Sequence, residues 1–332
     1  MTGGIELRPF DAGRIGEVVG VWNAAAGQAF PLREALFRQN TVLDPHFDPA
    51  GARLATEALT GRVIGCCVAK VAREPIGADG LLPDRGWISL VAVHPDYRRR
   101  GVGTSLLRAA EAFLSARTRP KAVLGGDPAH FFPGVPDETG AAAFFEAGGY
   151  TLRGEAYDLH RSLREYRTPE MVTAALAQNP DVEIRPLAAG EARALDRFLE
   201  ASFPGRWRYT MSRFLAGGGA VRDVMGVVQH GAVRGFAMLF HPGSRWIGPS
   251  IAWTSSGGGR GDDAAAGGLG PMGVAPELRG RGLGRVLLDR AIVHLAALGV
   301  QEMVIDWTIL LDFYGQLGFV PRRRYQHGER TL

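Results

Sequence analysis

Two stretches of this chain combine arginine and glycine in a spacing that suits phosphate binding. Residues 98–103 and 279–284 both read Arg-x-x-Gly-x-Gly, and each follows an apolar run and a proline and precedes an amphipathic helix. Glycines at the start of a helix leave backbone N–H groups that an anion can approach closely, and the helix dipole and the arginines strengthen the attraction. One copy alone could be a tight turn between a strand and a helix, but two copies favour a pair of pyrophosphate sites.

The repetition extends over most of the 332 residues. Arg8 and Arg185 stand at matching positions 177 residues apart, and Arg98 and Arg279 stand 181 apart. Such near-constant spacing indicates one fold used twice, and the length of the chain also suits about two domains. We therefore expect a first domain at 1–165, a linker at 166–181 and a second domain at 182–332.

In this setting both loops resemble the acetyl-CoA pyrophosphate loop of the GNAT superfamily of N-acyltransferases. Two copies in one chain are similar to the arrangement in the mycothiol synthases. The resemblance implies an α/β (α+β) fold with two acyl-CoA N-acyltransferase domains, each a mostly antiparallel, splayed sheet flanked by helices. It also implies that acetyl-CoA is the acyl-donor substrate and that the strand before each loop binds its pantetheine arm. Pro271 and the glycines beside it make the second of these strands the less regular one.

The cofactor-binding residues implied by the resemblance lie on these two strands and loops. In the first domain they are Val91, Ala92, Val93, Arg98, Arg99, Gly101, Val102, Gly103 and Thr104, and in the second they are Met272, Gly273, Val274, Arg279, Gly280, Gly282, Leu283, Gly284 and Arg285.

The transfer of an acetyl group to an amine requires proton transfers. An alkylammonium has a pKa of about 10.4, so only about one molecule in 10³ is neutral at pH 7. A base must therefore remove a proton, and an acid can protonate the leaving thiolate. In the GNAT family that acid is often a tyrosine within an aromatic-Tyr-x-x-Leu-Gly-Phe pattern. Tyr314 occupies that position and is expected to be catalytic, whereas the first domain has Phe145 there. The alternative for Tyr314 is an aromatic side chain at the edge of the core.

No single residue stands out as the base. Asp306 and Asp312 flank the stretch that leads to Tyr314, but a helix cap or a surface charge is the commoner role for each. Asp127 and His130 lie in a long Gly/Pro-rich loop of the first domain, where we expect solvated side chains, with the lining of an acceptor pocket as the less favoured alternative.

Three other stretches carry reactive or charged groups. Residues 322–324 are all arginine and either form a solvated sheet edge or reach an anionic ligand. Cys66 and Cys67 are adjacent on a predicted strand, point to opposite faces and are expected to be a reduced structural pair. Residues 255–264, rich in glycine, predict a surface loop, with a further phosphate site as the less favoured alternative.

The composition is that of an ordinary globular protein, with 46% hydrophobic and 22% charged residues. The net charge of +4 suits an anionic cofactor but falls short of what nucleic-acid binding requires. The sequence shows no Cys/His metal spacing and no apolar run long enough to span a membrane, and we expect no apolar leader. We expect a cytoplasmic protein without metal, nucleic-acid or membrane partners, and the oligomeric state stays open.

The favoured function is transfer of an acetyl group from acetyl-CoA to a primary amine of a small molecule, by direct attack on the thioester. The second domain is expected to be the catalytic half, and the first to bind acyl-CoA or to support the architecture. The alternative is a non-catalytic acyl-CoA-binding or sensing protein with degenerate active sites. Residues 306–308 and the helix after them lack the Asn-containing pattern common in mycothiol synthases, so the thiol-sugar acceptor is not carried over.

Overall fold

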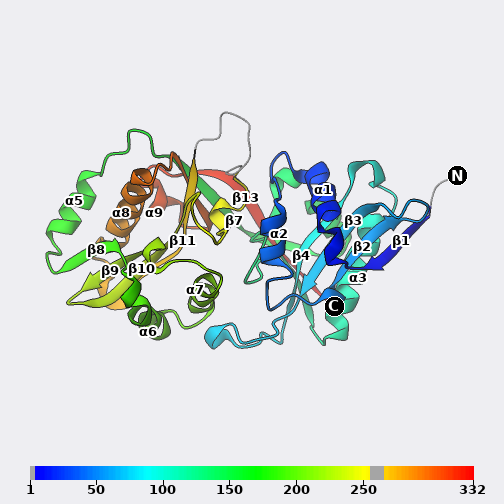
Figure 1. Cartoon of the computed structure of the whole chain (residues 1–332), viewed down its shortest axis with the longest axis horizontal. Helices are drawn as coiled ribbons and strands as arrows, with labels where there is room; N and C mark the ends of the chain where they lie inside the picture. The colour runs from blue at the N-terminus through cyan, green and yellow to red at the C-terminus, as the bar shows by residue number, and fades with distance from the viewer. Residues whose placement is uncertain (1–3, 255–264) are drawn as a thin grey trace. The chain divides into compact units, whose positions relative to one another are not determined.

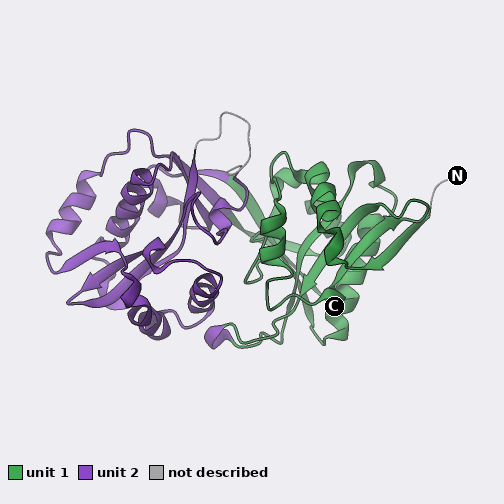
Figure 2. Cartoon of the chain, in the orientation of Figure 1, with its two compact units in different colours: residues 1–76, 80–156, 323–332 green, residues 77–79, 157–322 purple. Residues whose placement is uncertain are grey.

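A computed structural model describes residues 4–254 and 265–332, which divide into two compact units (Figure 2). The first unit contains the chain up to residue 76 together with 80–156 and 323–332, and the second contains 77–79 and 157–322. The predicted loop at 255–264 lies outside the described residues.

The first unit is a splayed sheet covered by helices (Figure 1). Its strands run in the order β1-β2-β3-β4-β5-β13, and the short β6 pairs with β13. All neighbours are antiparallel except β4 and β5, which are parallel. The predicted architecture is thus confirmed. The strands are β1 (Ile5–Pro9), β2 (Ala52–Glu57), β3 (Val63–Lys70), β4 (Gly86–Val93), β5 (Lys121–Leu124), β6 (Val135–Pro136) and β13 (Val320–Thr331).

Four helices of this unit cover the sheet. They are α1 (Ile15–Ala26), α2 (Glu34–Asn40), α3 (Val102–Ala116) and α4 (Ala142–Ala147). Helix α3 buries Leu106, Ala110 and Phe113 against β2, β3 and β4, as their i, i+4, i+7 spacing predicts. Complete burial of a leucine such as Leu106 contributes roughly 1.5 to 3 kcal/mol, so this face holds α3 and the loop before it in place. Cys66 and Cys67 are free and buried in β3, and burial raises the pKa of both thiols.

The second unit repeats the same sheet. Its order is β7-β12-β11-β10-β9-β8, with only β11 and β12 parallel. The strands are β7 (Thr151–Ser162), β8 (Val182–Pro186), β9 (Val224–Gln229), β10 (Ala232–Phe240), β11 (Ala266–Val274) and β12 (Glu302–Thr308). The helices are α5 (Glu170–Ala177), α6 (Ala192–Ser202), α7 (Arg206–Ala216), α8 (Leu283–Ala297) and α9 (Leu311–Gly315).

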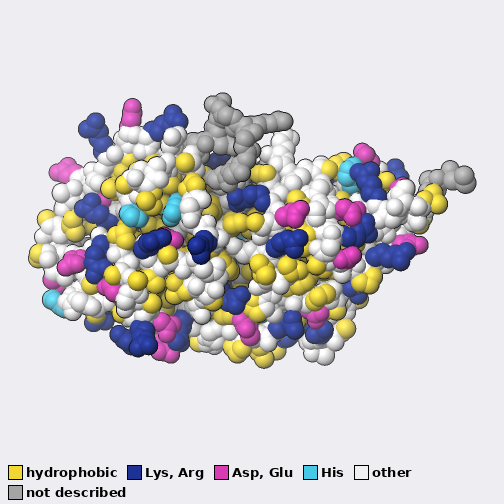
Figure 3. Space-filling view, in the orientation of Figure 1, with side chains coloured by type: hydrophobic (Ala, Val, Ile, Leu, Met, Phe, Trp, Pro, Cys, Tyr) yellow, Lys and Arg dark blue, Asp and Glu magenta, His cyan; other side chains and the backbone are white. Residues whose placement is uncertain are grey.

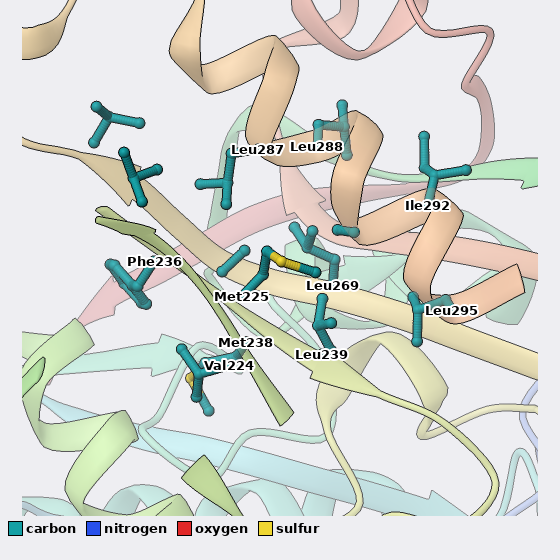
Figure 4. Close-up of a cluster of buried hydrophobic side chains, with 14 of the residues drawn as sticks. Val224, Met225, Phe236, Met238, Leu239, Leu269, Leu287, Leu288, Ile292 and Leu295 are labelled. Carbon is teal, nitrogen blue, oxygen red and sulfur yellow. The ribbon is translucent and has the colours of Figure 1, made fainter. Parts of the chain in front are cut away.

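One part of the core of the second unit lies between α8 and the sheet (Figure 4). Leu288, Ile292 and Leu295 of α8 are fully buried together with Leu239 of β10 and Leu269 of β11. Because α8 starts directly after the second Arg-x-x-Gly-x-Gly loop, this packing fixes the position of that loop.

The two units exchange their last strands. The expected domains, 1–165 and 182–332, do not include this exchange. Strand β7 follows the first repeat, but its residues 157–162 pair with β12 in the second unit. Strand β13 follows the second repeat, but its residues 328–331 pair with β5 in the first unit. Each strand is 12 residues long, or about 40 Å, which is long enough to begin in one unit and end in the other.

A short segment of the chain also reaches the second unit at 77–79. The N–H of Ala78 donates to the carbonyl of Pro204 at 2.9 Å, and Asp79 Oδ2 accepts from the N–H of Arg206 at 3.0 Å. Helix α7 has no side-chain cap of its own, so Asp79 satisfies one of its free N–H groups.

Charged side chains of both signs are interspersed over the face of the molecule seen in Figure 3. None of the helices in the described part of the chain is long and apolar enough to cross a membrane.

Candidate active site

The first unit contains a cavity of about 420 Å³ where β4 and β5 part. The two strands pair from Gly86 with Ala122 to Ile88 with Leu124, and there the ladder ends. Beyond this point residues 89–93 of β4 line the cavity. This is the splayed pair of strands that the sequence predicts.

The first Arg-x-x-Gly-x-Gly loop borders the same cavity. Gly101 has a φ of 80°, which glycine adopts easily, and nothing lies within 4 Å of the place where a Cβ would stand. Arg98 Nε donates to the carbonyl of Val93 at 3.4 Å, and another of its nitrogens donates to the carbonyl of Ala25 at 3.0 Å. The predicted residues that line the cavity are Val91, Ala92, Val93, Arg98, Arg99, Gly101, Gly103 and Thr104. Val102 is not among them, because its side chain is buried under α3.

Among the described residues, none in the wall of this cavity is an acid or a base suited to proton transfer. The ionisable side chains in its wall are Arg98 and Arg99, and an arginine stays charged at all working pH values. Phe145, at the position that corresponds to Tyr314, also lines the cavity. The geometry suits binding of a phosphate-bearing, partly apolar ligand, and leaves the first unit without an acid or a base at the cavity wall.

The long loop after β5 is buried, which corrects the expectation that Asp127 and His130 are solvated. Asp127 is 0% exposed and His130 is 6% exposed. Lys70 Nζ, also 0% exposed, donates to Asp127 Oδ1 at 2.7 Å, to Asp44 Oδ2 at 2.8 Å and to the carbonyl of Ala129 at 3.2 Å. Burial lowers the pKa of Lys70, but the two carboxylates outweigh burial and leave it above its ordinary value. Lys70 therefore anchors the loop whose later residues form part of the cavity wall.

The second loop has the same backbone shape as the first. Gly282 has a φ of 78°, and Arg279 Nε donates to the carbonyl of Val274 at 3.5 Å. Its surroundings differ, because α5 packs beside it (Figure 1). A Cβ on Gly282 would stand 2.7 Å from the Cβ of Ala175, and Asn179 Nδ2 donates to the carbonyl of Arg281 at 3.3 Å. The second loop is thus covered by α5 at Gly282, whereas the first loop is open at Gly101.

The strand before the second loop is also covered on one side. A Cβ on Gly273 would stand 2.6 Å from the ring of Phe203 and 3.0 Å from that of Trp207. Of the residues predicted in this unit, Met272, Gly273 and Gly284 keep partial exposure, and Leu283 is buried in the core under α8. Arg285 donates to Gln316 Oε1 at 2.9 Å.

Tyr314 and Asp306 lie together where β11 and β12 part. The last pair of that ladder is Leu269 with Ile305, one residue before Asp306. Tyr314 is 6% exposed, and burial together with the neighbouring Asp306 carboxylate raises its pKa. Burial and then Asp158 raise the pKa of Asp306 to about 7.

The structure corrects the expected role of Asp306, whereas the position of Asp312 agrees with the expected surface charge. Asp306 is neither a cap nor a surface charge, because its Oδ1 atom is buried and has no hydrogen-bond partner among the described residues. Asp312 is exposed in the first turn of α9, where a carboxylate favours the helix dipole.

Asp158 and Lys70 are the residues that sequence reasoning missed. Asp158 lies on β7, which belongs to the first repeat in the chain order, so no local pattern places it near Asp306. Lys70 did carry a signal, as the one charged residue at the end of an otherwise uncharged strand.

The arginine run 322–324 binds protein atoms at two of its positions. Arg323 donates to the carbonyl of Ala29 at 2.8 Å and lies over the ring of Phe30, and Arg324 pairs with Glu155 at 2.7 Å. Both side chains therefore contact the protein itself, and Arg324 is also exposed, as expected of a solvated sheet edge. Within the described ranges no group of three His, Cys, Asp or Glu side chains is placed to hold a metal.

The fold and the two loops define an acyltransferase architecture, and comparison with known proteins agrees. Residues 15–129 match the family model described as Acetyltransferase (GNAT) family, and residues 228–321 match the one described as Acetyltransferase (GNAT) domain. The chain therefore belongs to the GNAT acetyltransferase family, a family of acyltransferase enzymes, and carries the domain twice.

Several known proteins are similar to this chain over all or part of its length. A mycothiol acetyltransferase of Thermobispora bispora is 33% identical over 45% of this chain, a match that spans less than half, 47%, of that protein's length. One from Pseudarthrobacter chlorophenolicus is 29% identical over 71% of this chain and 68% of its own. Among solved structures, the glucosamine N-acetyltransferase region of a fungal multi-domain β-N-acetylglucosaminidase has a TM-score of 0.86 at 24% identity, over 99% of this chain and 38% of that one.

Proposed function

We propose that the protein transfers an acetyl group from acetyl-CoA to a primary amine of a small molecule, and that transfer takes place in the second unit. The observation that carries the proposal is Tyr314 beside Asp306 at the parting of β11 and β12. A phenol at this place can protonate the thiolate of CoA as the C–S bond breaks. The cytoplasm, expected from the sequence, stays the proposed location.

The cofactor would lie along β11 and the second loop. Met272, Gly273 and Val274 would face the pantetheine arm, and the amides that follow Arg279 would hold the pyrophosphate. Support comes from the left-handed Gly282 at the start of α8, which leaves the first N–H groups of the helix free. Residues of this unit assigned to the cofactor therefore keep their proposed role, except that the side chain of Leu283 is committed to the core.

The first unit would bind a second acetyl-CoA without turning it over. Its cavity carries the matching loop and splayed strands but lacks any acid or base in the wall. Such a site would serve affinity or stability, since a ligand that binds only the folded state stabilises that state.

Tyr314→Phe tests the location of transfer. We expect the release of free CoA thiol with an amine panel of amino sugars, amino acids and polyamines to fall by about 10²-fold or more, because the acid is lost. The matched control is Phe145→Tyr in the first unit, which should leave the rate near that of the unaltered protein. Full turnover in Tyr314→Phe would reverse the assignment.

The number of acetyl-CoA sites tests the role of each loop. Calorimetric titration should give two sites per chain, one of which disappears in Gly101→Val and the other in Gly282→Val. A single site that vanishes with Gly101→Val would leave only the first unit as a binder.

A non-catalytic acyl-CoA sensor is the second candidate. Two observations favour the sensor. Helix α5 contacts the second loop at Gly282, and the open cavity lies in the first unit, where its wall has no acid or base among the described residues. Tight binding of acetyl-CoA without thiol release under any amine would support the sensor.

A further inference from the structure

The second unit brings two carboxylates together at the parting of its sheet. Asp306 lies on β12 directly after the last residue that pairs with β11. Asp158 lies on β7, the strand on the other side of β12. Asp158 Oδ1 accepts a hydrogen bond from the N–H of Trp307 at 3.3 Å, so Asp158 is bound to the residue next to Asp306.

Asp306 is unlike a carboxylate that only stabilises a fold. Its Oδ1 atom is buried without a hydrogen-bond partner among the described residues, while the residue as a whole keeps part of its surface exposed. Gly270 leaves room for it, since a Cβ there would stand 2.8 Å from Oδ1. Native proteins rarely leave a buried acceptor unpaired, and an N–H donor on a bound ligand would complete this one.

We infer that Asp306 takes the proton of the acceptor amine, and that Asp158 is the positioning residue that tunes it. This inference rests on the proposed function. It also means that the strand exchange completes the transfer site, because Asp158 comes from the last strand of the first repeat.

The electrostatic surroundings of Asp306 support this role. The groups that act on it are Asp158 from β7, Arg206 from α7 and Tyr314 from α9. Burial, and then Asp158, raise its pKa, whereas hydrogen bonding to its own backbone and the charge of Arg206 lower it, and the result is a pKa of about 7. A general base works best when its pKa lies near the working pH.

The proton transfers form a balanced sequence. The acceptor ammonium gives one proton to Asp306, directly or through water, and the lone pair of the amine nitrogen then attacks the thioester carbonyl. The C–N bond forms, the C–S bond breaks, and the sulfur takes a proton from Tyr314. The second nitrogen proton returns to Tyr314 and the proton on Asp306 leaves to water, so one proton is released in each cycle. Because the charge of Asp306 contributes to the raised pKa of Tyr314, protonation of Asp306 makes Tyr314 a better acid when sulfur needs the proton.

The first unit cannot repeat this chemistry. The register of β5 with β13 places Gly125 at the position of Asp306 and His327 at that of Asp158. His327 Nδ1 contacts the carbonyl of Pro133 at 3.1 Å, and Phe145 replaces the tyrosine.

The pH dependence of acetyl transfer tests the inference. We expect kcat/KM of the unaltered protein to rise with a midpoint near pH 7, below the limb near pH 10 that belongs to the acceptor amine. Asp158→Asn keeps an oxygen for the N–H of Trp307 but removes a negative charge, so the midpoint should move to lower pH. Asp306→Asn should lower kcat/KM by about 10²- to 10⁴-fold and abolish the rise near pH 7. Asp306→Glu should restore part of the rate and part of that pH dependence.

Asp312→Asn is the matched control, since Asp312 is an exposed aspartate on the following helix, and it should leave the profile unchanged. An unmoved midpoint in Asp158→Asn overturns the tuning role, and an unchanged rate in Asp306→Asn overturns the proton transfer. If the unaltered protein acetylates no amine, the proposed function fails, and carbon-13 NMR titration of the Asp306 carboxyl in the free protein still decides the pairing. A midpoint near 7 that falls in Asp158→Asn supports the coupled pair, whereas a midpoint near 4 in the unaltered protein contradicts it.

Discussion

At the scale of single residues, Asp306 combines a reactive position with an unfavourable charge. An aspartate in an unfolded chain has a pKa of about 3.9, whereas burial and Asp158 raise that of Asp306 to about 7 in the fold. Between about pH 4 and about pH 7 the Asp306 carboxyl is therefore more often protonated in the folded state than in the unfolded state. The free energy of unfolding consequently falls as pH rises from about 4 to about 7.

Asp306→Asn should make the protein more stable at pH 8, because it removes the buried charge. We expect a gain on the order of 2 kcal/mol at pH 8 that shrinks towards pH 4.5, where Asp306 is protonated in the folded state. Urea denaturation of both proteins at the two pH values measures the difference. Asp312→Asn serves as the control and should show no such dependence. An equal effect of Asp306→Asn at both pH values would contradict the raised pKa.

At the scale of elements, helix α5 distinguishes two loops that are otherwise alike. The expected linker at 166–181 contains α5, and Val172 and Ala175 pack there on Val286 of α8. The first loop has no such cover at Gly101. A segment that reads as a connection between domains is thus in contact with a predicted cofactor loop.

Alanine substitution at Gly101 and Gly282 measures this difference. Both changes place a side chain at a positive φ and should each cost about 1 kcal/mol of stability. Gly282→Ala should cost more, because its Cβ would stand 2.7 Å from that of Ala175, whereas nothing lies within 4 Å at Gly101. Thermal or urea unfolding of each variant gives the comparison.

A double variant separates strain from steric conflict. Ala175→Gly combined with Gly282→Ala should recover the additional loss, while the same change combined with Gly101→Ala should recover nothing. Equal costs at the two glycines, with no coupling to Ala175, would mean that α5 does not press on the loop.

At the scale of the whole molecule, the exchange of β7 and β13 makes each unit depend on the chain of the other repeat. The first unit needs residues 323–332, where Tyr325 is 1% exposed and residues 328–331 pair with β5. The second unit needs residues 157–162, which pair with β12.

Removal of residues 323–332 should therefore damage the first unit, although they follow the second repeat. We expect amides of β5 to lose protection in hydrogen exchange, and Trp22 and Trp87, both 4% exposed, to become more accessible to a fluorescence quencher. Amides of β9 and β10 should stay protected. Tyr325→Ala in the full chain should produce the same pattern to a smaller degree. Loss of protection confined to the second unit would refute the exchange.

How far the sequence can predict this protein depends on whether a feature is local. The amphipathic helices that begin at Val102 and Leu283 and the strands before the two loops were predictable, because each depends on neighbouring residues. The burial of the loop around Asp127 was not, because its partner Lys70 lies 57 residues away in the chain.

Local residue patterns were enough to predict the repeat, the family and the two Arg-x-x-Gly-x-Gly loops, since glycine conformation and apolar periodicity act over a few residues. The contacts of the folded chain set which loop is covered at its glycine, which carboxylates lie close together and which strand completes each sheet. These outcomes depend on contacts between segments far apart in the chain, such as Asp158 with Trp307 at a separation of 149 residues. A periodic pattern shows that a strand has a partner, but it does not show which strand that partner is.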